Sequence, residues 1–127
     1  MDIRTILNIE PKNLEYIYIL INFLLEMNNI EQAKILLATV EEEAPLSPLT
    51  LCAGAGVNLA ENDIKKAEEK INKAKKQEAK YYIIQYLSGK IAEKKGNVSQ
   101  ALKYYKQTLK YKPFWEEAKR EVEKLKV

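Results

Sequence analysis

The stretch Leu51–Ala60, LCAGAGVNLA, holds the residue types that most suggest chemistry in this chain. It contains the only cysteine, Cys52, and two closely spaced glycines, Gly54 and Gly56. A glycine-rich loop can bind phosphate, and a cysteine thiolate can act as a nucleophile. However, a dinucleotide-binding loop needs a glycine three residues beyond Gly56, where Leu59 stands. A cysteine nucleophile usually needs a base such as histidine, and the sequence has none.

The same absences bear on metals, catalysis and location. Without histidine the chain lacks the commonest metal ligand and general base, and a single cysteine can form no internal disulfide. We therefore expect no metal ion, no cofactor and no enzymatic activity. The longest apolar stretch, Tyr16–Leu25, is about half the roughly 20 residues that a membrane helix needs, and the N-terminus lacks the pattern of a signal peptide. We expect a cytoplasmic protein, or a soluble fragment of a larger or membrane-associated one.

Charge is distributed unevenly along the chain. The net charge is +3. Residues 1–47 contain 3 basic and 8 acidic residues, a net charge of −5, whereas residues 82–127 contain 11 basic and 5 acidic residues, a net charge of +6. We therefore expect an acidic end and a basic end, with the acidic run Glu41–Glu43 at the acidic one.

Three segments share a pattern with a period of 34 residues. They are MNNIEQAKILLATVEEEAP, ENDIKKAEEKINKAKKQEA and KGNVSQALKYYKQTLKYKP. Alanine recurs at the same place in each segment, a large apolar or aromatic residue follows four positions later, and proline or alanine closes the segment. The positions are Ala33, Ala67 and Ala101; Leu37, Ile71 and Tyr105; and Pro45, Ala79 and Pro113.

The pattern predicts a helix, a short turn and a second helix in each unit. Asn29, Asp63 and Asn97 are good N-cap residues for the second helices, because their side-chain oxygens can accept from free backbone N–H groups. Apolar residues then recur at helical spacing. Three further segments have helical length and few helix breakers, and these predict the first helices: 14–26, 49–61 and 82–94. Stacked pairs are expected, because one helical pair cannot bury its apolar faces alone.

This arrangement resembles the tetratricopeptide repeat (TPR) family, whose 34-residue unit has the same alanine, aromatic and proline rhythm. The third unit is most similar, with Gly89 and Ala92 in its first helix and Gly96-Asn97 in its turn. The resemblance implies an all-α fold, a right-handed α-solenoid of three repeats, 14–47, 48–81 and 82–115. Residues 116–127 would form a C-terminal capping helix, and residues 1–13 a partial N-terminal cap or the tail of a preceding repeat.

The resemblance also implies a binding surface, because the first helices of such repeats line a concave groove. In this chain the residues at the groove-lining positions are Tyr18, Asn22 and Leu25; Leu49, Cys52, Ala53 and Gly56; and Ile83, Tyr86, Leu87 and Lys90. Of the positions that bind a carboxylate terminus in one subfamily, only Asn22 has a suitable side chain. The groove instead suits an apolar segment or an amphipathic helix.

We therefore expect a non-catalytic protein-interaction module or scaffold adaptor within a larger assembly. One alternative is a self-associating protein whose groove receives its own chain. Another is a basic solenoid on nucleic acid or an anionic membrane surface, since lysines crowd the second helices of units two and three. Acidic residues interrupt these lysines and the chain has only two arginines, so nucleic acid is not the expected partner.

The repeat places the stretch LCAGAGV inside a helix. Gly54 and Ala55 then fall where helices of such repeats approach one another closely. Cys52, Ala53 and Gly56 are expected to face the groove and to form a nearly bare floor there.

Overall fold

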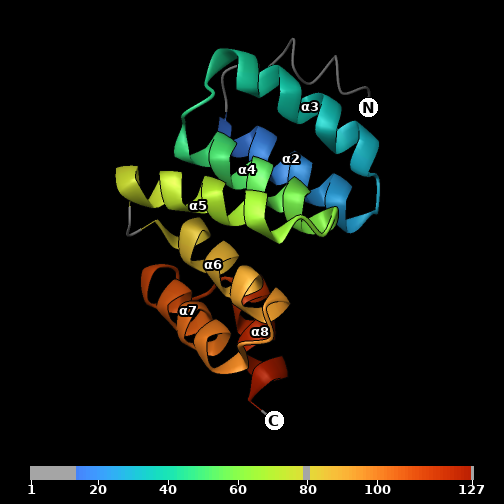
Figure 1. The fold of residues 1–127 in the computed structure, drawn as a ribbon. Coiled ribbons are helices and arrows are strands. Elements are labelled where there is room, and N and C mark those ends of the chain that lie inside the picture. The colour runs from blue at the N-terminus through green and yellow to red at the C-terminus, as the bar shows by residue number, and fades with distance from the viewer. Residues whose placement is uncertain (1–13, 79–80, 127) are drawn as a thin grey trace.

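The computed structural model describes residues 14–78 and 81–126, and this part of the chain forms seven α-helices and no strand. The helices are α2 (Leu14–Glu26), α3 (Ile30–Glu43), α4 (Pro48–Ala60), α5 (Ile64–Glu78), α6 (Tyr82–Lys94), α7 (Val98–Tyr111) and α8 (Glu116–Leu125). They follow one another from α2 and α3 at one end of the molecule to α7 and α8 at the other (Figure 1). The all-α prediction is confirmed for these residues.

The helix starts repeat with the period found in the sequence. Helices α2, α4, α6 and α8 begin at residues 14, 48, 82 and 116, and helices α3, α5 and α7 begin at 30, 64 and 98, so each series advances by 34 residues. Two of the three predicted first helices have the observed bounds. The remaining one, predicted at 49–61, is observed as α4 at Pro48–Ala60. It begins one residue earlier because Pro48 takes the first helical position after Ser47, where its missing N–H costs nothing.

The turn that ends α2, α4 and α6 is the same each time. Its middle residue has a left-handed conformation, with φ of 59° at Asn28, 62° at Asn62 and 81° at Gly96. The next N–H then donates to a carbonyl five residues back, from Asn29 to Leu24 at 2.8 Å, with equivalent bonds in the other two turns. This Schellman motif satisfies carbonyls that the helix end would leave without partners.

The predicted N-cap residues precede α3, α5 and α7, but only two of them cap with their side chains. Asp63 Oδ1 accepts from the Lys66 N–H at 3.3 Å, and Asn97 Oδ1 accepts from the Gln100 N–H at 3.1 Å. Asn29 makes no such side-chain bond. The start of α3 is instead fixed by the turn before it.

Packing between helices follows chain order. Each of α3, α5 and α7 contacts the helix before it and the helix after it, while α2 contacts α4 and α4 contacts α6. One buried cluster runs from α2 to α6, and a smaller one, with Ala92, Ala101, Tyr105 and Val122, joins α6, α7 and α8. Helix α4 therefore has neighbours on several sides.

Two parts of the sequence prediction lie outside the described residues. They are the partial cap at 1–13 and Ala79, the closing position of the second unit. Among the helices that are described, none is both long enough and apolar enough to cross a membrane.

Candidate binding surface on the first helices

The eleven residues predicted to line a groove divide into two groups by burial. Five are buried: Tyr18, Cys52, Ala53, Ile83 and Leu87. Six are half-buried and reach the surface: Asn22, Leu25, Leu49, Gly56, Tyr86 and Lys90. Only the second group can contact a partner without a change in packing.

The expectation that Cys52 and Ala53 form a bare groove floor is wrong. Cys52 is 0% exposed and Ala53 1% exposed. Both lie on α4, which contacts α2, α3, α5 and α6, so their small side chains are covered by neighbouring helices. Burial raises the pKa of the Cys52 thiol to about 12, which keeps the thiol neutral and unreactive at ordinary pH.

Gly56 marks the place where α2 and α4 meet at the surface. A Cβ atom at Gly56 would lie 3.5 Å from Leu25 Cδ1 and 3.7 Å from Asn22 Oδ1, which are ordinary contact distances. The half-buried residues of α2 and α4 therefore adjoin one another. A methyl group fits at Gly56, whereas a long side chain would extend over Leu25 and Asn22.

The Tyr18 hydroxyl lies beneath this surface. Burial raises the pKa of Tyr18 well above its usual value. No hydrogen bond of normal geometry reaches the hydroxyl from the described residues, although the Asn22 side chain lies near enough to offset part of the rise in its pKa. Tyr18 thus supports the surface from below and is not itself accessible.

Helix α8 closes the C-terminal end of the surface. The Tyr86 ring lies 4.7 Å from the Trp115 ring, centroid to centroid, and Lys90 Nζ donates to Glu121 Oε1 of α8 at 2.9 Å. Burial alone would raise the pKa of Glu121, but hydrogen bonds from Lys90 and Lys124 outweigh that effect and lower it. The Lys90 ammonium is therefore held in an ion pair at this end.

Two further features were not predicted from the sequence. The first is a hollow of about 200 Å³ between α5, α6 and α7, with Ile71 and Ile91 among its lining residues and Lys75 over the Tyr104 ring beside it. At the equivalent place one unit earlier, the Lys70 side chain extends past Gly54 and donates to Asn58 Oδ1 at 2.6 Å. Tyrosine at 104 in place of lysine is the signal that distinguishes the two places.

The second unpredicted feature is an exposed apolar stripe along α2 and the turn after it. It consists of Tyr16, Ile19 and Phe23 of α2 and Met27 of the turn. These residues recur at helical spacing. The groove prediction included Ala53 and Leu87, the equivalents of Ile19 in the later units, but none of these four residues. A comparison of each position with its equivalents 34 and 68 residues later could have identified them.

Ion pairs connect successive units at equivalent positions. Lys34 Nζ lies 3.0 Å from Glu61 Oε2, and Glu68 pairs with Lys95. Both pairs join a second helix to the end of the next first helix, with opposite polarity. Within the described residues, no group of three or more histidine, cysteine, aspartate or glutamate side chains is arranged to hold a metal ion.

No model of a known protein family matches the chain, and a search of the curated proteins found no match.

Proposed function

We propose that this protein is a TPR-like interaction module that binds an apolar segment or an amphipathic helix along α2, α4 and α6. The observation that carries the proposal is the shared 34-residue period of the helix starts, of the three left-handed turns and of the helix contacts. A right-handed solenoid built from such units places its first helices along one concave surface. The period, and the contact of each helix with the next along the chain, support such an arrangement.

The contact residues in this proposal are the half-buried ones. Leu25 and Gly56 provide an apolar place between α2 and α4, and Tyr86 provides an aromatic edge on α6. Asn22 and Lys90 provide the polar groups on either side. A ligand with a few apolar side chains would bury these residues and would remove few charged groups from water. Recognition would then rest on buried area and aromatic contact.

Gly56→Leu tests the proposal, because a long side chain there would occupy the space over Leu25 and Asn22. We expect the Gly56→Leu chain to lose the proteins that the wild-type chain captures in an unbiased pull-down. Gly56→Ala is the matched control and should retain them, since a methyl group fits at this position. Thermal unfolding of both variants verifies that the fold is intact. Tyr18 is unsuitable for such a test because its removal would leave a cavity.

The same captured proteins with wild type and with Gly56→Leu, both folded, would contradict binding at this surface. Light scattering on the wild-type chain checks the self-associating alternative. If Gly56→Leu converts an oligomer to a monomer, the ligand of the surface is the chain itself.

A further inference from the structure

The exposed stripe on α2 lies where other units are covered. Ile19 is 59% exposed and Phe23 54% exposed. The residues 34 positions later, Ala53 and Val57, are 1% and 3% exposed. The residues 68 positions later, Leu87 and Ile91, are each 5% exposed. The same helix face is therefore buried in α4 and α6 and open in α2.

Helices cover this face in the later units. Ala53 and Thr50 of α4 lie close to Ile17 and Ile21 of α2 and to Val40 of α3, and all five are buried. The face in α4 is thus covered by both helices of the unit before it. By equivalence, the open face of α2 has the shape and spacing to receive a helix.

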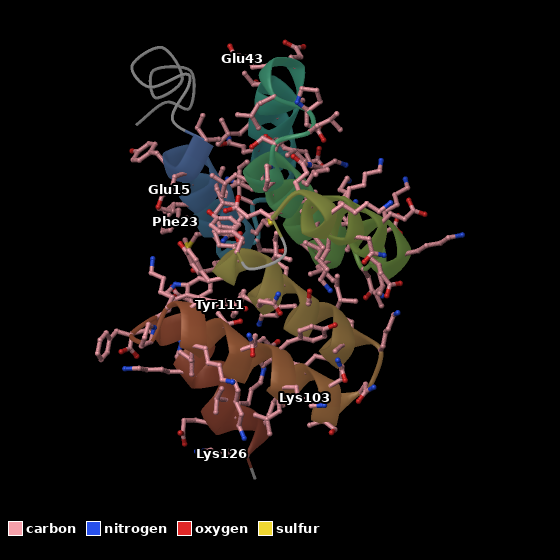
Figure 2. The ribbon with its side chains drawn as sticks, turned by 90° about the vertical axis from the view of Figure 1, so that its left-hand side faces the viewer. Glu15, Phe23, Glu43, Lys103, Tyr111 and Lys126 are labelled. Atoms are coloured by element: carbon pink, nitrogen blue, oxygen red, sulfur yellow. The ribbon has the colours of Figure 1, made fainter. Side chains whose placement is uncertain are left out.

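The charge at this edge differs from that of the inner interfaces. Glu15 occupies the position that is Leu49 in α4 and Ile83 in α6, and both of those residues pack into the core. Glu15 and Glu26 are both exposed on α2. The first 47 residues carry a net charge of −5, and Figure 2 shows Glu15 and Phe23 in the same half of the molecule as Glu43, away from Lys103 and Lys126.

We propose that the outer face of α2 docks an amphipathic α-helix of a partner protein, which has an apolar stripe with lysine or arginine along its flank. The apolar stripe of the partner helix would cover Ile19 and Phe23. Its basic flank would meet Glu15 and Glu26, since opposite charges across an interface direct association and fix register. Ile19 and Phe23 are not among the half-buried residues of the surface proposed between α2 and α4. An antiparallel two-fold pair of copies would place the acidic edges of α2 against each other, which disfavours a second copy as the occupant of this face.

The test uses two synthetic helices of about 18 residues, longer than the roughly 17 Å that the stripe spans at 1.5 Å per residue. Both have leucine at helical spacing, and one has lysine on its flanks where the other has glutamate. Fluorescence anisotropy measures their affinity for the full chain. We expect the lysine helix to bind at least about tenfold more tightly than the glutamate helix.

Variants of the full chain locate the binding. Ile19→Glu and Phe23→Ser should each weaken the lysine helix by about tenfold or more, and both positions are exposed, so the fold should persist. Glu15→Lys with Glu26→Lys should reverse the preference between the two helices. Gly56→Leu should leave binding unchanged, which separates this test from that of the proposed function.

Four results would overturn the proposal. Equal affinity for the two helices would remove the charge argument, and an unchanged affinity in Ile19→Glu would place the binding elsewhere. A dimer in light scattering that Ile19→Glu dissociates would make a second copy the occupant. Tighter binding after Ile3→Asp with Ile6→Asp would make residues 1–13 the occupant.

Discussion

The glycines show how strongly a single residue position can be constrained. A Cβ atom at Gly89 would lie 2.5 Å from the Tyr105 ring, closer than real Cβ atoms come to such atoms. Tyr105 is 0% exposed, and its hydroxyl donates to Glu93 Oε1 at 2.5 Å, so the ring has little freedom to move. Gly89 is therefore required by packing, whereas Gly56 is not.

We expect Gly89→Ala to lower the free energy of unfolding by about 1–3 kcal/mol, because overpacking forces the buried ring or the helices apart. Gly56→Ala is the matched change on the other helix. It should raise the free energy of unfolding by up to about 1 kcal/mol, because alanine favours a helix over glycine. Urea denaturation of both variants measures the difference. Equal effects of the two substitutions would show that Gly89 has room for a methyl group.

For individual residues, the sequence predicted the position on a helix better than the exposure of the side chain. Helical spacing placed Cys52, Ala53 and Gly56 on α4, but it could not tell which of them a neighbouring helix covers. That depends on which helices pack against α4, and α2, α3, α5 and α6 all do so. The exposed Phe23 was missed for the same reason, since its exposure arises from the absence of a covering helix among the described residues.

Helices α2, α4 and α6 all end in the same type of turn. Asn28, Asn62 and Gly96 all have a left-handed conformation, and the same two backbone hydrogen bonds follow at each. Nothing lies within 4 Å of a Cβ atom at Gly96. The only constraint at this position is therefore the backbone conformation, and asparagine tolerates that conformation better than other residues with a side chain do.

Gly96→Val should lower the free energy of unfolding by about 1–2 kcal/mol, because a β-branched residue is strained in this conformation. Gly96→Asn should cost clearly less, as the natural asparagines at 28 and 62 indicate. Chemical denaturation compares the two variants with the wild type. If valine and asparagine destabilise equally, the turn changes conformation and the strain argument does not hold.

Helix bounds were largely predictable because local signals fix them. Period, N-cap residues and proline positions predicted six of the helices to within about one or two residues at most ends, as is usual for helix boundaries, and a C-terminal helix within 116–127. The side-chain cap at Asn29 was not correctly predicted. A short polar residue before a helix can cap it, but the turn geometry decides whether its oxygen reaches a free N–H group.

Within the described residues, one thiol and several phenol groups are buried or half-buried. Burial raises the pKa of Tyr18, Tyr86 and Tyr105 above the usual value of 10.0, and a hydrogen bond to Glu93 adds to the effect at Tyr105. Burial also raises the pKa of Cys52 from 9.0 to about 12. The folded chain therefore holds protons that the unfolded chain releases at alkaline pH.

We expect the free energy of unfolding to fall as pH rises above about 9. Between about 9 and 12 the unfolded Cys52 thiol ionises while the folded one stays neutral, which costs up to about 1.4 kcal/mol per pH unit. Above about 10 the buried tyrosines add to the loss. Urea denaturation at pH 7.5, 9 and 10 measures the slope. Cys52→Ala should have a smaller slope between pH 9 and 10, and an unchanged slope would show that the thiol makes no contribution.

The opposite polarity of the two inter-unit ion pairs has a consequence for assembly of the chain. Repeat proteins are prone to domain swapping and to docking a unit on the wrong neighbour while they fold. Here the second helix of the first unit offers Lys34, which suits Glu61 but would meet Lys95 if the third unit docked in place of the second. The surface pairs contribute little stability. Their value lies in discrimination, because only the correct order of units brings unlike charges together at both junctions.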